Sequence, residues 1–306
     1  NVGLDVNLFN NRLSGVFEWY QRNTNGMLAP GVQLPAVVGA SAPYQNTADM
    51  RTRGWELSLN WRDQIGKVGY RIGFNLSDYK SEIIKYDDNA ATKLLSSYYP
   101  GQTLGEIWGY VVDGYYTVDD FVDTSSWQLK EGVTSINGYN VRPGDVKFKN
   151  LRDDDTSTNV ITSGDNTFDN PGDRKVIGNT TPRYQYGINL GMNYAGFDLN
   201  VILQGTGKRD YWISNVLTFP MNGDNFVPLF EGLSDYWMPK DPDNGDWSAV
   251  NPNAKYPRIY GNRGNSGSNL RQSDKYLSDA SYLRIKNITL SYKLPKKWVN
   301  QIFLNQ

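Results

Sequence analysis

The residues best suited to bind an ion lie in an acid-rich segment near the middle of the chain. Its oxygen donors include Asp153, Asp155, Asp165, Asp169 and Asp173. Carboxylate oxygens are the ligands that hard cations such as Ca²⁺ take in proteins. However, the spacing of these residues matches no EF-hand loop, and acidic stretches are commonly solvated surface. We favour the solvated loop, with no cofactor, and keep a structural cation as the alternative.

Catalytic chemistry is restricted by what the sequence lacks. The 306 residues contain no histidine and no cysteine, which excludes Ser-His-Asp triads, histidine bases and histidine metal sites. We recognise no other convergent nucleophile and base, so we expect the protein not to be an enzyme. The net charge of −1 provides no basic surface for nucleic acid, which we therefore exclude as a partner.

Aromatic residues make up 13% of the sequence and cluster in two segments. Amphipathic aromatic side chains suit both sugar stacking and protein interfaces. They can equally form a small hydrophobic core within a long loop. We predict that part of this set contacts a substrate or a protein lid, with internal packing as the alternative. The candidates are Tyr98, Tyr99, Trp108, Tyr110, Tyr115, Tyr116, Tyr211, Trp212, Trp237 and Trp247.

The elements that position these residues are strands, and the clearest signal lies at 185–204. Apolar and polar residues alternate there with the period of a strand, in two arms joined by a turn at Ala195 and Gly196. The first apolar row carries an aromatic residue, Tyr186 and Tyr194, at each end. This pattern is typical of a transmembrane barrel hairpin with an apolar outside and a polar lumen. A soluble antiparallel sheet with one face on a core alternates equally well.

Similar alternation elsewhere predicts about seven long strands in all. The others lie near residues 2–8, 13–22, 55–61, 68–77 and 283–292. For 13–22, alternation does not assign the facing of the side chains. In the last strand the alternation changes phase between residues 285 and 288, which predicts a β-bulge or a strand end that leaves the membrane.

The polar side chains on the face opposite the apolar rows should face the lumen. There they could line a transport path or hydrogen-bond a plug, and the sequence does not separate the two roles. The predicted lumen-facing residues are Glu56, Asn60, Arg71, Asn75, Asn189, Asn193, Asp198 and Gln204.

Short and long connections alternate along the chain. Short turns are predicted at 10–12, 63–67 and 195–196, and long segments at 24–52, 79–184 and 208–280. Outer-membrane barrels have this arrangement because one rim carries tight periplasmic turns and the other carries large extracellular loops. Compact soluble domains rarely contain such long loops. The connections therefore favour the membrane barrel over the soluble sheet.

Seven strands cannot close a barrel around a lumen, and an open sheet would leave unpaired backbone groups in lipid. We therefore expect residues 1–306 to be one barrel portion of a longer polypeptide. The whole protein would be far larger.

Several blocks, in the correct order, resemble SusC-like TonB-dependent transporters over nearly the whole chain. They are NTADMRTRGWELSLNW (46–61), GQTLGEIWGYVVDGYY (101–116), GDVKFK (144–149), GDRKVIGNTTPRYQYGINLGMNYAGFDLNVILQGTG (172–207) and KYLSDASYLRIKNITLSYKLPKKW (275–298). One departure concerns the acidic loop between the third and fourth blocks. Family members often carry a D-x-N-G-D-G-like sequence there, whereas this chain has Asp153 to Asp155 followed by Thr156 and Ser157.

The resemblance implies an all-β fold, an antiparallel transmembrane barrel of about 22 strands whose lumen is plugged, with long extracellular loops. The plug is absent from this chain. The implied function is import of oligomeric nutrients, glycans or peptides, across the outer membrane of Gram-negative bacteria. The implied partners are a SusD-like lipoprotein that acts as a lid, the TonB complex acting through the absent plug, and outer-membrane lipid. A passive porin, an outer-membrane enzyme and a soluble β-rich glycan-binding or adhesive protein are the alternatives.

Overall fold

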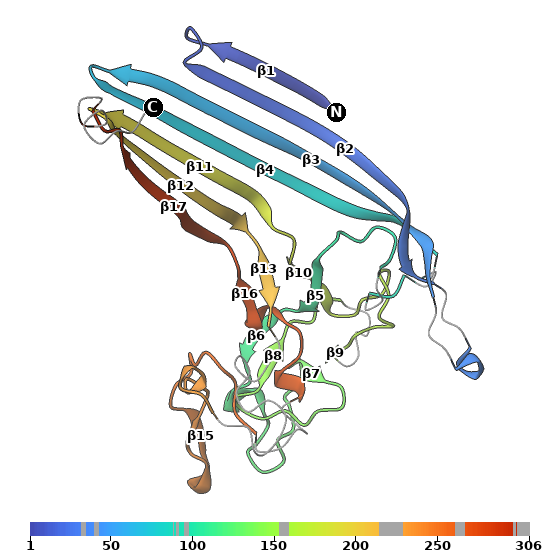
Figure 1. The fold of residues 1–306 in the computed structure, drawn as a ribbon. Coiled ribbons are helices and arrows are strands. Elements are labelled where there is room, and N and C mark those ends of the chain that lie inside the picture. Colours follow the sequence, from blue (N-terminus) through green and yellow to red (C-terminus); the bar gives the residue numbers. More distant parts are fainter. Residues whose placement is uncertain are drawn as a thin grey trace.

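Seven long strands form a single antiparallel sheet that runs through most of the molecule (Figure 1). The computed structural model describes residues 1–31, 35–39, 43–87, 89, 92–94, 98–152, 159–213, 229–260, 267–295 and 298. The strand order in the sheet is β1-β2-β3-β4-β11-β12-β17. The strands are β1 (Val2–Leu8), β2 (Leu13–Pro30), β3 (Tyr44–Ile65), β4 (Val68–Tyr86), β11 (Arg183–Tyr194), β12 (Phe197–Lys208) and β17 (Tyr282–Tyr292).

The short connections all lie at one end of this sheet, and the long connections lie at the other (Figure 1). Strands β3 and β4 are joined through the pair Ile65 and Val68, and β11 and β12 through Tyr194 and Phe197. The turn between the latter two has positive φ at both Ala195 (50°) and Gly196 (91°). Two-residue turns with this backbone match the twist of a hairpin. The predicted alternation of short and long links is confirmed at these positions.

The two faces of the sheet differ sharply in polarity. Directly opposed residues in an antiparallel ladder point to the same side, so the register defines each face. One row crosses five strands through Leu59, Phe74, Ile188, Leu203 and Ile285. We call this side the apolar face. Many of its side chains are exposed, among them Leu190, Ile288 and Leu290.

The opposite side, which we call the polar face, carries short polar and charged side chains. The register also shows which way the side chains of β2 face, which alternation alone does not predict. Phe17 and Trp19 lie opposite Leu57 and Trp55 on the apolar face, and Glu18 lies opposite Glu56 on the polar face. The facing of β2 could not be predicted from alternation because Gly15 lies on the apolar face and Val16 lies on the polar face. Neither row of side chains is therefore uniformly apolar or uniformly polar.

The predicted bulge in the last strand is present. Ile202 of β12 pairs with Asn287, whereas the next residue, Leu203, pairs with Ile285. Lys286 is therefore the extra residue of a β-bulge, and it restores the apolar side chains of β17 to the apolar face.

Three strands are longer than the sequence predicts. Strands β2, β3 and β4 have 18, 22 and 19 residues. The prediction of a long loop at 24–52 is wrong, because β2 continues to Pro30 and β3 begins at Tyr44. The extra length lacks apolar alternation. It is held by polar cross-strand pairs such as Arg53 with Gln21, and by a small core of Ala29, Ala48, Ile83 and Tyr86. At about 3.3 Å per residue β3 is roughly 70 Å long, whereas about 9–11 residues cross a bilayer.

The long connections contain short elements that lie together beyond one end of the sheet (Figure 1). Their hydrophobic residues form separate small cores, one around Tyr116, Val146 and Phe148 and another around Leu233, Tyr256 and Tyr276. No helix in the described ranges is long and apolar enough to cross a membrane. The short strands are β5 (Glu106–Tyr110), β6 (Val112–Tyr115), β7 (Ser135–Ile136), β8 (Val146–Phe148), β9 (Val160–Ile161), β10 (Arg174–Asn179), β13 (Asp210–Trp212), β14 (Pro239–Asp241), β15 (Asp246–Ala249) and β16 (Leu277–Asp279). The 3₁₀ turns are η1 (Ala36–Val38), η2 (Val118–Asp120), η3 (Glu231–Leu233), η4 (Pro242–Asn244) and η5 (Asp274–Tyr276).

Candidate functional site

The polar face brings together all eight residues that the sequence predicts to face a lumen. Three rows of the ladder suffice to place most of them: Asn60 and Asn189 flank Gly73, Asn75 and Gln204 flank Gly187, and Asn193 is paired with Asp198. The remaining residues, Glu56 and Arg71, share the side of these rows. Their contact with a transport path or a plug stays a prediction.

Glycines on this face make room for longer side chains from neighbouring strands. Gly191 of β11 lies beneath Arg71 of β4, and a Cβ at Gly191 would meet Arg71 Cγ at 2.5 Å. The guanidinium therefore crosses β11 and donates to β12, with Nη2 at 3.5 Å from both Asp198 Oδ1 and Asn200 Oδ1. These contacts link three strands on the polar face.

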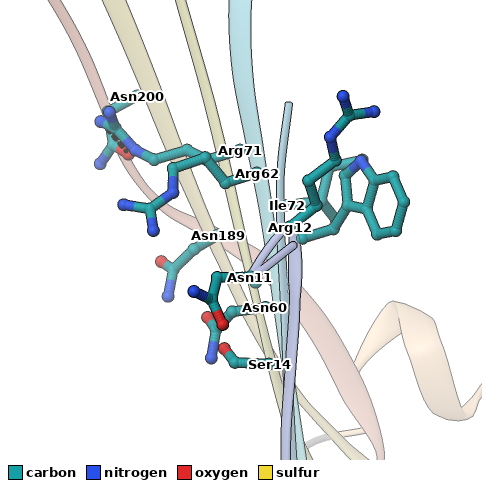
Figure 2. Close-up of a pocket in the computed structure, with 11 residues that line it drawn as sticks. Asn11, Arg12, Ser14, Asn60, Arg62, Arg71, Ile72, Asn189 and Asn200 are labelled. Atoms are coloured by element: carbon teal, nitrogen blue, oxygen red, sulfur yellow. Dashed lines mark hydrogen bonds between the residues drawn. The ribbon is translucent and has the colours of Figure 1, made fainter. Parts of the chain in front are cut away.

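A shallow pocket of about 450 Å³ lies at the short-turn end of the polar face. Figure 2 shows Arg62 and Arg71 extending on the same side as the asparagines of the pocket, whereas Arg12 points to the other side. Arg62 is not among the residues predicted to face the lumen, although the alternation of β3 continues past Trp61 and places it on the polar face. Asn11, Ser14, Asn60, Asn189 and Asn200 complete the polar lining.

A buried ion pair holds β4 and β11 together close to the point where β11 begins. Arg183 donates through Nε and Nη2 to the two carboxylate oxygens of Asp78, whose side chain is 7% exposed. Bidentate arginine–carboxylate contacts fix geometry as well as charge. The pair therefore anchors the long excursion between these strands at its return to the sheet.

Four of the ten candidate aromatic residues are buried in the loops, and two of them, Tyr110 and Tyr116, belong to a loop core. Tyr99, Tyr110, Tyr116 and Trp237 are at most 7% exposed. Tyr116 donates its hydroxyl to the carbonyl of Thr134 at 2.6 Å, and burial raises its pKa above the usual range. These four residues stabilise the loops where they lie, and contact with a partner would require the loops to open.

The other six candidates are more accessible. Tyr211 is 48% exposed, and Tyr98, Trp108, Tyr115, Trp212 and Trp247 are half-buried. Trp247 stacks edge-on against Trp127 with ring centroids 5.0 Å apart, and the guanidinium of Arg258 lies 4.9 Å from its centroid. Such contacts hold two loops together. A contact role for these six residues stays a prediction.

A buried carboxylate that the sequence analysis missed organises the loops. Asp145 is 2% exposed and accepts hydrogen bonds from Tyr260 Oη (2.7 Å), Asn269 Nδ2 (2.8 Å) and the backbone N–H of Arg142 (2.8 Å). Burial raises the pKa of Asp145, and these hydrogen bonds act in the opposite direction. No local sequence signal identifies Asp145, because its partners Tyr260 and Asn269 are distant in the sequence.

The acidic candidates for a cation are dispersed. Asp153 and Asp155 lie outside the described residues, and Asp165 and Asp169 are on the surface. Asp173 is fully buried and accepts from the backbone N–H groups of Leu151 and Thr162, so it shapes the loop. Across the described part of the chain, no group of three acidic side chains could hold a metal ion.

Comparisons with known proteins match nearly the whole chain, although no protein-family model matches it. The chain is 27% identical to TonB-dependent receptor P3 of Formosa agariphila over 98% of its length, and 23% identical to TonB-dependent receptor SusC of Bacteroides thetaiotaomicron over 99%. It spans about a quarter of these relatives, 27% and 26% of their lengths.

Comparison of the fold with solved structures also gives a match over nearly the whole chain. The solved structure of the RagAB peptide importer in its closed-closed state has a TM-score of 0.66, 22% sequence identity, and coverage of 97% of this chain and 29% of its own. The sheet and its loops therefore share the fold of part of that importer. Over nearly its whole length, the chain is a homologue of the TonB-dependent receptors that include SusC.

Proposed function

We propose that the chain forms part of the barrel wall and the extracellular loops of a TonB-dependent importer in the outer membrane of a Gram-negative bacterium. The whole protein would carry oligomeric nutrients, glycans or peptides, across that membrane without acting as an enzyme. Residues 1–306 would constitute one portion of a single barrel domain. Its apolar face would contact lipid, and its polar face would border the lumen.

One observation carries this proposal: the sheet is apolar on one side and polar on the other, and every long connection leaves it at the same end. In a bilayer, an apolar face on the outside of a sheet is stable because lipid covers it. In water, the same exposed face would promote association with other proteins. The exposed row of Ile288 and Leu290 on β17 has this property. The relatives, which are named as receptors and importers, support the same function.

The partners follow from the same relatives. SusC and the RagAB importer support pairing with a SusD-like surface lipoprotein and energy supply by the TonB complex. The loop surface offers a suitable docking element in the hairpin of β14 and β15, which projects away from the sheet (Figure 1). Its tip, residues 242–245, is exposed. We propose that the lipoprotein lid contacts this hairpin.

The test replaces Pro242 to Gly245 by two glycines in the full-length transporter and measures lid co-purification and uptake of the oligomeric substrate by whole cells. The replacement removes no residue of the loop cores, so the barrel should fold as before. We expect weaker lid association and slower import. The control variant Lys67→Gly changes the turn at the opposite end of the sheet.

Uptake and lid binding at the wild-type level in the hairpin variant would refute the docking role of the hairpin. Uptake that is independent of any lid and of the TonB complex would refute the importer and identify a passive porin. Resistance of the folded protein to heat and protease provides the check that both variants retain the barrel.

A further inference from the structure

Basic side chains gather on the apolar face of the sheet, just beyond the aromatic residues that end its apolar rows. Toward the end that carries the long connections (Figure 1), Trp19 of β2 lies opposite Trp55 of β3. The next residue of β3 on this face is Arg53, which lies opposite Lys80 of β4, and Arg51 follows one step further out. Each step of two residues is roughly 7 Å long. We call Arg51, Arg53 and Lys80 the basic patch.

Neighbouring carboxylates do not neutralise the basic patch. Arg53 and Lys80 are exposed, and the Cβ atoms of such direct partners lie about 4.5–5.5 Å apart, where like charges destabilise a sheet. Arg51 has Glu82 as its register partner, but across the described part of the chain none of the three basic groups forms an ion pair. Glu106, whose charge is felt by Lys80, accepts hydrogen bonds within its own loop instead.

Two neutral amides of β2 orient the arginines of the patch. Gln21 Oε1 accepts from Arg53 Nε at 2.9 Å, and Asn23 Oδ1 accepts from Arg51 Nε at 3.3 Å. Within the described ranges, the Nη groups of both arginines make no hydrogen bond. Each guanidinium is therefore held at Nε and keeps a fork of donors for an anion. Such forks match the geometry of a phosphate group.

The short-turn end of the same face is different. Arg12 extends there on the side away from Arg62 and Arg71 (Figure 2), and its charge is neutralised by Asp63 at 3.1 Å. The two ends of the apolar face therefore differ in charge, and the end with the long connections has an excess of positive charge.

We propose that the basic patch binds the phosphate headgroup of a lipid in the extracellular leaflet of the outer membrane. The Nη groups of Arg51 and Arg53 donate to the phosphate oxygens, and the amine of Lys80 supplies a further positive charge. Trp19 and Trp55 contact the upper part of the acyl chains. The site rests on the proposed function in one respect, which is that the apolar face contacts lipid and the long connections are extracellular.

The position of the patch favours a lipid over a free anion. Aromatic residues at the end of an apolar band mark the level at which acyl chains meet headgroups. The patch lies one step beyond this level, so a phosphate bound there can carry acyl chains that cover the apolar rows. Basic groups next to a membrane-embedded surface attract anionic headgroups by the same electrostatics.

The first test measures lipid binding to the purified full-length transporter in mild detergent. Phosphatidic acid, whose headgroup is a bare phosphate ester, is added, and native mass spectrometry counts the bound lipid. Replacing all three basic residues by glutamine should lower the affinity by about 100-fold, because each basic group near an anionic headgroup contributes separately. The matched control Arg22→Gln lies next to Gln21 on β2 but on the polar face, and should leave the affinity unchanged.

Equal affinity of the triple variant and the wild type would overturn the site. Inorganic phosphate that binds as tightly as phosphatidic acid would overturn the assignment to a lipid. Resistance to heat and protease checks that the triple variant retains the fold.

The second test separates a built site from diffuse attraction. Arg51→Lys combined with Arg53→Lys keeps both charges but removes the forks that Gln21 and Asn23 orient. We expect the affinity for phosphatidic acid to fall by roughly tenfold, which corresponds to the loss of one charge-assisted hydrogen bond. Wild-type affinity in this double variant would overturn the site and leave attraction by net charge.

The third test concerns the leaflet. The full-length transporter is purified from outer membranes, and mass spectrometry identifies the lipids that accompany it. Phosphate-bearing glycolipids, which Gram-negative bacteria place in the extracellular leaflet, should accompany the wild type and be depleted in the triple glutamine variant. Equal amounts in both would overturn the assignment to this leaflet. No readout here involves import, so a failure of the site is distinguishable from a failure of the proposed function.

Discussion

At the scale of single residues, the polar side chains of the sheet and of the loops lie in different environments. On the sheet, polar side chains are open to the space in front of it, and glycines such as Gly191 let them cross strands. In the loops, several polar side chains are buried and hydrogen-bonded. Asp145 is the clearest case, since it joins the segments around Arg142, Tyr260 and Asn269.

Replacing Asp145 by alanine should loosen the loops without affecting the sheet. Each buried donor left without its acceptor costs about 1–3 kcal/mol, and Asp145 serves three donors. We expect faster hydrogen exchange of the amides of Arg142 and Val146 in the full-length protein. Asp123→Ala, in an exposed turn closed by Ser125 and Ser126, should leave those amides unchanged. Equal exchange in both variants would contradict the role of Asp145.

Lys275 predicts a pH dependence of loop stability. Its amine lies 4.5 Å from the ring centroid of Tyr115, and burial lowers its pKa to about 8 from the ordinary lysine value of 10.5. Between these two values the unfolded loop binds more protons than the folded loop, so the contribution of Lys275 to stability rises with pH. We expect the wild-type loops to resist protease better at pH 9.5 than at pH 7.5. Lys275→Met should reduce this increase, and an unchanged pH profile would contradict the prediction.

At the scale of elements, each strand separates two environments, and a charge should distinguish them. Leu190 lies on the apolar face of β11, and its neighbour Asn189 lies on the polar face. Arginine at Leu190 should cost about 2–4 kcal/mol, as on the lipid side of a barrel near the midplane. Asn189→Arg should cost much less. A folding assay in lipid vesicles that shows equal tolerance would remove the membrane assignment of the apolar face.

The central parts of the strands could be predicted from sequence because one face of the sheet is apolar and the other is polar, so that alternate residues differ in polarity. The hairpin at Ala195 and the bulge at Lys286 followed from the same pattern. The outer ends of β2, β3 and β4 could not, since period two is lost there and their small core of Ala29, Ala48, Ile83 and Tyr86 is assembled from three different strands. Their hydrogen-bonded pairs, such as Thr52 with Ser81 at 2.8 Å, depend on partners distant in sequence.

The residues of the candidate site also fall into a group that could be predicted from the sequence and a group that could not. The eight polar residues of the sheet were found because facing is a local property of a strand. The loop aromatics were not resolved into core and surface, because their burial depends on contacts between segments far apart in sequence. Tyr115, for example, donates its hydroxyl to the carbonyl of Ala254 at 2.9 Å.

At the scale of the whole molecule, the separation of short and long connections predicts topology. If the short turns are periplasmic, an epitope inserted at Gly245 should bind antibody on intact cells, because this turn lies at the tip of the β14–β15 hairpin. An epitope inserted between Ala195 and Gly196 should bind only after the outer membrane is permeabilised. The reverse labelling would mean that the barrel is inserted in the opposite direction.

The long connection between Tyr86 and Arg183 joins two neighbouring strands, β4 and β11. The ion pair of Asp78 and Arg183 holds these strands together. The entropy of closing a loop grows only slowly with its length, by about 0.6 kcal/mol for each doubling. Insertions, deletions or even the exchange of the entire excursion should therefore leave the sheet intact. Recombination could therefore exchange this loop region while the sheet stays unchanged, which makes the loops the part of the fold that can vary most freely among related proteins.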